Sequence, residues 1–342
     1  MKNNFAKKLI EWYKINQRDL PWRNTNDPYK IWVSEIILQQ TRIDQGTPYY
    51  LNFIEKFPHV KKLADSTLDD LMKVCQGIGY YSRIVNMHKC AKIVVSEYNS
   101  NFPSKYDQLL NLPGIGDYTA SAISSICSGE SKMVVDGNVI RLFSRLYNLN
   151  YQQHSSMMKK TIKKIGEKEI LKFKSGDFNQ ALMDYGSMIC SPKKSKCDIC
   201  IFSKSCKAFK LDIVDKLPVK KKNISISQRF FNYFIVLDKS SKVKIHKRKE
   251  KDIWNNLYEF ELLETNNKIS FKKAESYLKE KHERLSFKKK HQVSHKLTHQ
   301  VLSIDFWIFE VDEVFNKLGL DIPSLNNYPF PKPIFSIISK IQ

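Results

Sequence analysis

Residues 111–126, NLPGIGDYTASAISSI, contain a short glycine turn between two helical patterns. Gly114 and Gly116 can adopt backbone angles that are closed to other residues, so we expect a tight turn here. The amide groups of the turn, with the positive end of the helix that opens near Tyr118, could bind one phosphate. A Gly-x-Gly pair alone is weak evidence, because in most proteins it forms only a tight turn.

Helical patterns extend in both directions from this turn and fill the chain to about residue 210. They are interrupted only by short Gly, Pro or Asp segments, and they show hardly any two-residue alternation. We expect helices in the N-terminal segment, around Glu35, and over residues 47–57, 67–76, 81–99, 117–128, 137–148, 156–173 and 179–189. The first 212 residues are therefore predicted to form an all-α domain.

The character of the sequence changes after Cys206. Residues 213–229 are basic, polar and weakly patterned, which is typical of a linker. Beyond them lie one expected helix, FKKAESYLKEKH, and the β-rich runs FFNYFIVLD, KVKIHKR, LYEFELL and VLSIDFWIFEV. Residues 230–342 are therefore predicted to form a separate α+β domain.

The composition favours a polyanionic partner. Lys and Arg outnumber Asp and Glu by 57 to 35, a formal net charge of +22. Such a charge points to nucleic acid rather than a neutral metabolite, although basic proteins also bind membranes and acidic partners. We find no apolar run long enough to span a bilayer and no signal peptide. Seven cysteines, an odd number, indicate a reducing compartment.

Four of the cysteines form the strongest single signal, with the spacing C-x6-C-x2-C-x5-C. They are Cys190, Cys197, Cys200 and Cys206. Four thiols so close in sequence can surround one metal centre. The spacing does not distinguish a Zn(Cys)4 site from a cubane iron–sulfur cluster, because both use four thiolates. The remaining cysteines, Cys75, Cys90 and Cys127, lie in helical patterns, and we interpret them as core residues.

Two carboxylates stand out from their surroundings. Glu35 lies in IWVSEIIL, where apolar residues occupy nearly every side of a helix. An unpaired carboxylate in such a place is costly, so proteins keep one there when it is paired or when its chemistry needs a raised pKa. Asp136 precedes the next helical pattern, and its plainest interpretation is a helix N-cap.

Several segments together resemble the adenine-specific DNA glycosylases of the endonuclease III superfamily, which remove adenine mispaired with 8-oxoguanine. They are SEIILQQT, QGIGYYSR, LPGIGDYTA, VDGNVIR, FNQALMDYG and the four cysteines. The resemblance implies a multidomain protein, with an all-α helix-hairpin-helix core that carries a [4Fe-4S] cluster loop and a C-terminal α+β Nudix-like domain. It implies that the four cysteines hold the cluster.

The resemblance also implies roles for the two carboxylates. Glu35 would protonate the departing adenine at N7, and its apolar helix would keep its pKa high enough to hold a proton near neutrality. Asp136, which we expect to be the more solvated, would stay ionised and stabilise the sugar cation. Asn138 and Tyr118 match positions that line the same pocket.

Further residues are implied to contact DNA. Gln39 and Tyr80 match the positions that fill the gap left by the extruded base. Trp22, Arg23 and Gln180 resemble the adenine pocket.

The resemblance also concerns strand cleavage. Relatives that cut the backbone carry a lysine nucleophile where this chain has Tyr118, and residues 112–122 contain no lysine. Because a Schiff base needs an amine, we expect a monofunctional glycosylase.

The C-terminal domain resembles the Nudix-like reader of the oxidised guanine. IWNNLYEFE fits that domain, and KLTHQ stands where the family has a Phe-Ser-His loop. The matching residues are Leu297, Thr298 and His299, so the hydroxyl and the imidazole are kept while the aromatic ring is not. We find no acidic pyrophosphatase cluster in the sequence, so nucleotide hydrolysis is not expected.

The resemblance implies a monomeric repair enzyme, cytoplasmic and associated with the bacterial nucleoid, that acts on double-stranded DNA containing adenine opposite 8-oxoguanine. Two alternatives remain open. A bifunctional endonuclease III-like glycosylase/lyase for oxidised pyrimidines is disfavoured by the missing hairpin lysine and the extra domain. A non-catalytic iron–sulfur DNA-binding protein would not require both Glu35 and Asp136.

Overall fold

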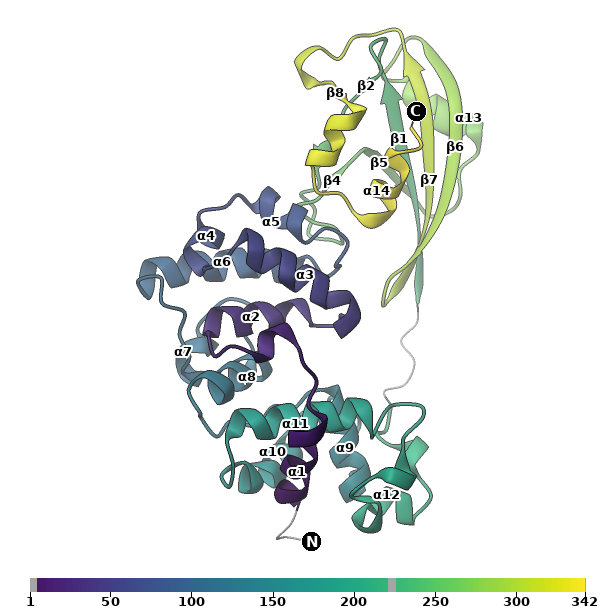
Figure 1. Ribbon diagram of the computed structural model, residues 1–342. Helices are drawn as coiled ribbons and strands as arrows, with labels where there is room; N and C mark the ends of the chain where they lie inside the picture. Colours follow the sequence, from purple (N-terminus) through teal and green to yellow (C-terminus); the bar gives the residue numbers. More distant parts are fainter. Residues whose placement is uncertain (1–4, 221–225, 342) are drawn as a thin grey trace. The chain divides into compact units, whose positions relative to one another are not determined.

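The computed structural model describes residues 5–220 and 226–341, and the chain divides into two compact units (Figure 1). Unit 1 contains residues 1–65 and 86–222, and unit 2 contains residues 66–85 and 223–342. Part of the linker predicted over residues 213–229, namely residues 221–225, lies outside the described residues. The first strand begins at Ser227, so the last residues of that predicted linker belong to the sheet.

Unit 1 consists of helices and short 3-10 turns, as the sequence predicts. The helices are α1 (Phe5–Asn16), α2 (Pro28–Ile37), α3 (Ile43–Lys56), α4 (Val60–Ala64), α6 (Ser82–Glu97), α7 (Tyr106–Leu110), α8 (Asp117–Cys127), α9 (Gly137–Tyr147), α10 (Ser156–Ile170), α11 (Ser175–Met188) and α12 (Lys207–Lys210). Helix α11 begins four residues before its predicted start. Gly176 lies inside this helix, although glycine disfavours a helix interior. A Cβ at this position would approach Ile126 Cα to 3.0 Å, so the close packing here favours glycine.

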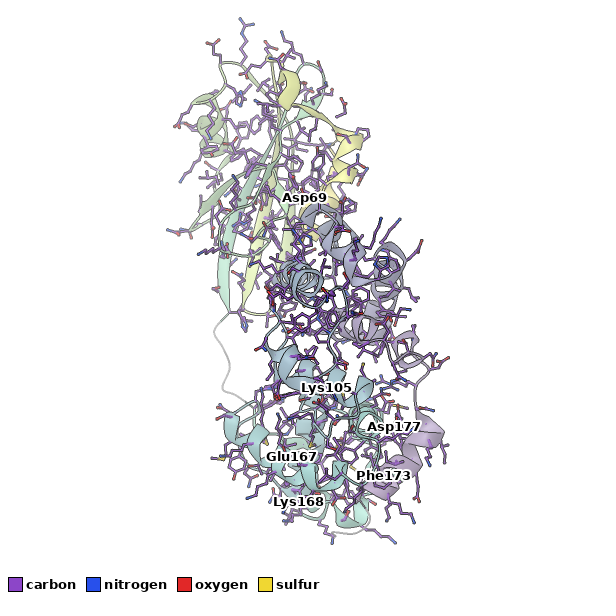
Figure 2. The ribbon with its side chains drawn as sticks, turned by 90° about the vertical axis from the view of Figure 1, so that its left-hand side faces the viewer. Asp69, Lys105, Glu167, Lys168, Phe173 and Asp177 are labelled. Carbon is purple, nitrogen blue, oxygen red and sulfur yellow. The ribbon has the colours of Figure 1, made fainter. Side chains whose placement is uncertain are left out.

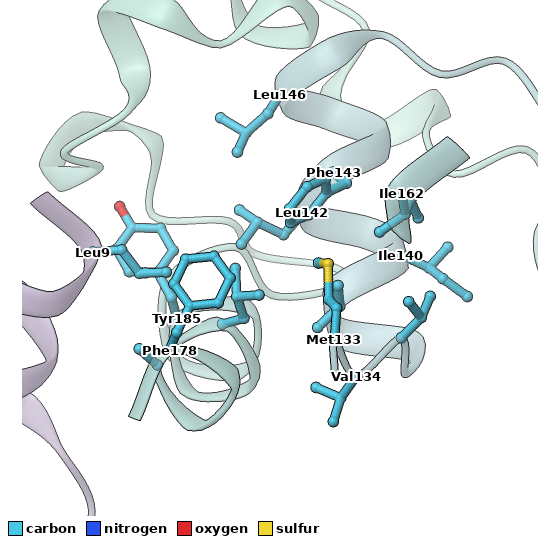
Figure 3. Packing of buried hydrophobic residues seen from close by; sticks show 14 of the residues in the cluster. Leu9, Met133, Val134, Ile140, Leu142, Phe143, Leu146, Ile162, Phe178 and Tyr185 are labelled. Carbon is cyan, nitrogen blue, oxygen red and sulfur yellow. The ribbon is translucent and has the colours of Figure 1, made fainter. Parts of the chain in front are cut away.

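One core of unit 1 joins α1, α9, α10 and α11 (Figure 3). Phe143 of α9 and Phe178 of α11 are fully buried in it, and so is Leu9 of α1. Burial of each such side chain contributes about 1.5–3 kcal/mol. This core fixes the N-terminus of α9 and one face of α11, and both carry residues of the candidate site.

Helix α2 is buried on most of its circumference, as the sequence predicts. Ile31, Trp32, Ile36 and Ile37 are each at most 2% exposed. The helix begins after Asp27, whose carboxylate accepts the Tyr29 N–H at 2.9 Å. It packs against α8, the helix that follows the glycine turn.

Unit 2 is an α+β structure, also as predicted. Its main sheet has the strand order β6-β7-β1-β2-β8, with β5 also paired to β1, and β3 and β4 form a separate pair. The strands are β1 (Ser227–Leu237), β2 (Lys242–Val243), β3 (His246–Lys247), β4 (Tyr258–Glu259), β5 (Glu261–Thr265), β6 (Leu285–Lys296), β7 (Gln300–Val311) and β8 (Leu320–Asp321). The helices of this unit are α5 (Leu68–Val74), α13 (Phe271–Lys279) and α14 (Lys332–Ile338).

Strands β1 and β7 are parallel along their whole length and form the centre of the sheet, while β6 and β7 form an antiparallel hairpin. Tyr233 of β1 stacks on Phe306 of β7 with ring centroids 5.5 Å apart. Within the described ranges, we find no helix that is both long enough and apolar enough to cross a membrane.

Candidate active site

Glu35 and Tyr118 face each other from α2 and α8. Burial, and then the negative charge of Asp136, raise the pKa of Glu35 to about 7, while the Tyr118 hydroxyl and the Arg23 charge oppose the rise. The pKa of Tyr118 lies well above its usual value because of burial and the nearby Glu35, so its hydroxyl keeps its proton and can donate. That hydroxyl also lies 3.4 Å from Met183 Sδ. The Glu35 side chain is partly buried.

Asp136 is the N-cap of α9, and its Oδ1 accepts the Val139 N–H at 2.7 Å. Its Oδ2 accepts from Asn138 Nδ2 at 2.8 Å. Burial raises the pKa of Asp136, against those hydrogen bonds and the charge of Arg141. Glu35 and Asp136 are both partly buried, so the expectation that Asp136 is the more solvated of the two stays a prediction. Two hydrogen-bond donors at a helix N-terminus, rather than water, therefore favour its ionised form.

A chain of hydrogen bonds runs from Asp136 toward the first cysteine of the predicted cluster loop. Asn138 Oδ1 accepts from Arg141 Nη2 at 2.8 Å, and Arg141 Nε donates to the Cys190 carbonyl at 2.6 Å. Arg141 Nη2 also donates to the Gly186 carbonyl at 2.6 Å. Arg141 is only 8% exposed, so it joins α9, the end of α11 and the cysteine loop in one buried network.

Arg23 is held by a buried carboxylate. Its guanidinium donates to both oxygens of Asp184 at 2.6 and 2.8 Å, and Arg18 Nε donates to the same carboxylate at 2.9 Å. Asp184 is fully buried, and hydrogen bonds from the two arginines hold its pKa below the usual value in spite of burial. Trp22, the neighbour of Arg23, is buried edge-on against Tyr50 with ring centroids 5.2 Å apart.

Gln180, one helical turn before Asp184 on α11, accepts a hydrogen bond from the Tyr13 hydroxyl at 2.6 Å. Both residues and Arg23 line a cleft of about 820 Å³ in unit 1. Phe173 and Asp177, labelled in Figure 2, belong to its wall. A purine base is much smaller than this cleft.

The two glycines of the turn differ in backbone conformation, which was not predicted. Gly114 has φ +78°, and a Cβ there would lie 2.8 Å from Asn86 Cβ. Gly116 is the N-cap of α8 with φ −98°, so only Gly114 needs the left-handed conformation. Gly116 is exposed, has open space where a Cβ would stand, and leaves the first amides of α8 without a side-chain cap. That arrangement is suited to an anion.

The four cysteines of the loop line one small apolar pocket together with residues of α9. All seven cysteines of the chain are free thiols. Arg145 Nη1 lies 3.4 Å from Cys190 Sγ, and the Tyr185 hydroxyl lies 3.1 Å from Cys200 Sγ. Donors aimed at sulfur fit thiolate ligands of a metal centre. Among the described residues, however, we find no group of three or more His, Cys, Asp or Glu that could hold a metal ion, so the cluster stays a prediction.

Three predicted DNA-contacting residues lie in unit 2. Thr298 and His299 are exposed in the turn between β6 and β7. The Thr298 hydroxyl is 2.5 Å from that of Tyr80, a residue that is 45% exposed and has φ +50°. An aromatic residue held out in this strained conformation is unusual for a core position.

Three of the predicted catalytic residues, Glu35, Tyr118 and Asp136, thus influence one another's pKa, and Asn138 is hydrogen-bonded to Asp136. Gln39 follows α2 and is partly buried. Sequence reasoning missed the residues that position the site, namely Tyr13, Arg18, Arg141 and Asp184. The sequence did mark some of them, because VIRLFSRL and QALMDYG each place a charged residue within an apolar helical pattern.

Two protein families match the chain. Residues 33–168 match the HhH-GPD superfamily of base excision DNA repair proteins. Residues 232–340 match the NUDIX domain. The two matches fall on the helical part and on the sheet-containing part of the chain.

The chain is similar to adenine DNA glycosylases, along nearly its whole length in one case and over part of its length in another. An adenine DNA glycosylase of Buchnera aphidicola subsp. Schizaphis graminum is 34% identical over 341 residues, covering 98% of this chain and 97% of that protein. The adenine DNA glycosylase of Homo sapiens is 34% identical over 213 residues, covering 60% of this chain and 39% of that protein.

Solved structures share the helical fold. A thermostable thymine-DNA glycosylase is 29% identical, covers 60% of this chain and 95% of its own, and superimposes with a TM-score of 0.56. A trapped endonuclease III–DNA covalent intermediate, 21% identical with a TM-score of 0.52, covers 61% of this chain and 95% of its own and shows the same fold.

Proposed function

Because the chain belongs to the adenine DNA glycosylases, within the HhH-GPD superfamily of base excision repair proteins, we propose that it removes adenine paired with 8-oxoguanine or guanine. The chain is a DNA glycosylase, a hydrolase of N-glycosyl bonds, and its partner is DNA. The base opposite the adenine, the residue roles and the cofactor are the proposed part. The observation that carries the proposal is the Glu35 carboxyl, whose pKa is about 7, beside the hydrogen-bonded Asp136.

The reaction needs an acid on the base and an anion near the sugar. The adenine, turned out of the duplex, receives the Glu35 proton at N7, and the N-glycosidic electron pair leaves with the base. With a pKa of about 7, Glu35 is protonated in about half of the molecules at neutral pH. An ordinary glutamate would be protonated in fewer than about one in a hundred.

Asp136 stabilises the oxocarbenium-like sugar that remains. Hydrogen bonds from Val139 and Asn138 at the start of α9 favour its ionised form, against the burial that raises its pKa. Glu35 lacks such backbone donors, and so the two carboxylates divide the acid and anion roles by their surroundings. Water then adds to the sugar carbon and gives up one proton to the Glu35 carboxylate, which restores the acid and completes the hydrolysis.

The turn before α8 holds the DNA backbone. The exposed amide of Gly116 and the uncapped start of α8 would bind one phosphate near the flipped nucleotide. Trp22, Arg23 and Gln180 bind the adenine, and Gln39 and Tyr80 fill the gap in the stack. In unit 2, Thr298 and His299 read the oxidised guanine.

The four loop cysteines would hold a [4Fe-4S] cluster, which would cross-link the loop. Support comes from the four cysteines that line one pocket without forming a disulfide. Arg145 lies beside the sulfur of Cys190, and the Tyr185 hydroxyl lies beside that of Cys200. The hydrogen bonds of Arg141 connect this loop to the N-terminus of α9.

The test is single-turnover adenine release from duplexes with adenine opposite 8-oxoguanine, guanine or cytosine, analysed before and after alkali. We expect release opposite 8-oxoguanine and guanine, little opposite cytosine, and strand breaks only after alkali, since residues 112–122 offer no lysine amine. Strand breaks without alkali, or release of oxidised pyrimidines instead of adenine, would show the bifunctional alternative. Tight binding without base release would show a binding protein.

A further inference from the structure

The amide of Gln180 is held in one orientation by a residue far away in the sequence. Tyr13 of α1 donates its hydroxyl proton to Gln180 Oε1 at 2.6 Å across 167 residues. Tyr13 is only 5% exposed, and burial raises the pKa of its hydroxyl to about 12, so the group keeps its proton at neutral pH. Within the described residues, Gln180 Oε1 is the acceptor that the structure gives to this hydroxyl.

The other half of the amide is available to a ligand. Within the described part of the chain, Gln180 Nε2 donates to no protein acceptor. The buried polar atoms without a hydrogen-bond partner do not include it. The atom is therefore in contact with solvent, and Gln180 lines the cleft beside Arg23. The Gln180 amide thus presents a fixed donor, the NH2 group, next to a fixed acceptor, the second lone pair of Oε1.

The cleft is connected to the catalytic carboxylate through charge. Asp184, one turn after Gln180 on α11, holds Arg23, whose positive charge lowers the pKa of Glu35. The same helix therefore carries a base-reading amide and the carboxylate that positions Arg23.

We propose that Tyr13 is a specificity-determining positioning residue, which fixes the Gln180 amide so that it reads the amino group of adenine and rejects 6-oxopurines. Adenine places an N6 amino donor beside the N1 acceptor, which matches an amide oxygen beside an amide NH2. N7 remains free for Glu35. Hypoxanthine reverses this edge, with an O6 acceptor beside an N1–H donor.

To pair with hypoxanthine, the Gln180 amide would have to turn over. Its NH2 group would then face Tyr13, and the buried hydroxyl proton would lose its acceptor. Loss of one such hydrogen bond corresponds to about a tenfold change in an equilibrium. Tyr13 therefore contributes about tenfold to the preference for adenine, over and above the difference in reactivity of the two bases.

This inference rests on the proposed function, since it assumes that Gln180 contacts the flipped base. The experiment compares single-turnover release of adenine and of hypoxanthine, each opposite the same 8-oxoguanine, by the wild type and Tyr13→Phe. We expect the adenine-to-hypoxanthine rate ratio to fall about tenfold in Tyr13→Phe. A merely structural role would slow both bases alike and leave the ratio unchanged, which would overturn the inference.

Tyr29→Phe is the matched control, because it removes a buried tyrosine hydroxyl that donates to the Phe57 carbonyl at 2.7 Å, away from Gln180. Its ratio should equal that of the wild type. A second background tests whether Tyr13 acts through the Gln180 amide. In Gln180→Glu, two equivalent acceptor oxygens leave nothing to turn over, so adding Tyr13→Phe should no longer change the ratio.

An equal fall of the ratio in both backgrounds would overturn the role of Tyr13. The outcomes separate this inference from the proposed function. Wild type that releases no adenine refutes the proposed function, and the inference falls with it. Wild type that releases adenine, with a ratio unchanged in Gln180→Ala, refutes only the inference.

Discussion

Removing the Tyr118 hydroxyl should move the pH dependence of base release in a defined direction. The reaction needs protonated Glu35, whose pKa is about 7, so the rate should fall tenfold per pH unit well above that value. The hydroxyl of Tyr118 donates to the ionised form of Glu35 and lowers its pKa. In Tyr118→Phe that stabilisation of the anion is lost, and the alkaline limb should move to higher pH.

The size of the shift follows from the strength of one hydrogen bond to a charged group, about 1.5–3 kcal/mol when fully buried. The lower end of this range corresponds to about one pH unit, which is the shift that we expect. Other effects of the substitution change the maximum rate in the pH–rate profile, whereas a change in the pKa of Glu35 moves the midpoint of that profile.

The assay is the single-turnover rate of adenine release from pH 6 to 9.5 at constant ionic strength, with enzyme in excess over a duplex containing adenine opposite 8-oxoguanine. Tyr29→Phe serves as the control and should keep the wild-type midpoint, since its hydroxyl bonds a backbone carbonyl elsewhere. A midpoint that stays in place in Tyr118→Phe, or moves to lower pH, would refute the assignment of Glu35 as the acid hydrogen-bonded to Tyr118.

Four further predictions concern stability and DNA binding. Glu35→Gln should stabilise the protein at pH 8 by about 3 kcal/mol and by less than about 1 kcal/mol at pH 5, measured by urea unfolding. With its folded pKa raised from 4.5 to about 7, wild-type Glu35 costs stability as pH rises through that range. Arg141→Gln should cost about 2–4 kcal/mol in the same assay, because it breaks the four hydrogen bonds of a buried guanidinium. Asp184→Asn should cost about 3–5 kcal/mol and lower the Tm, because two arginines lose their buried carboxylate; an unchanged Tm would contradict this. Gly114→Ala should destabilise the fold by about 1–3 kcal/mol, whereas Gly116→Ala should leave stability within about 0.5 kcal/mol and weaken duplex binding, measured by fluorescence anisotropy.

The helical part of the fold could be predicted because its apolar spacing is regular. Helices α8 and α9 match their predicted ranges to within one residue. Short helices such as α4 and α7 were missed, since five residues carry too little periodicity. Strand β6 was also missed, because lysines occupy several of its positions and a register shift at Phe287–Lys289 interrupts its alternation.

The candidate site was only partly predictable for a different reason. Glu35 and Asp136 stand out locally, one by its apolar helix and the other by its place before a helix. The contacts that position the site join residues distant in sequence, such as Tyr13 with Gln180 and Arg23 with Asp184. No local pattern reveals such pairs.

The central claim, that Glu35 is the acid which releases adenine, is tested most directly by measuring single-turnover release and duplex affinity for the wild type and Glu35→Gln on adenine opposite 8-oxoguanine. The account predicts unchanged or tighter binding and a loss of release of about 10²–10⁴-fold, because the amide keeps the shape of the carboxyl but has no proton to give. Release by Glu35→Gln within a few-fold of the wild type would contradict it.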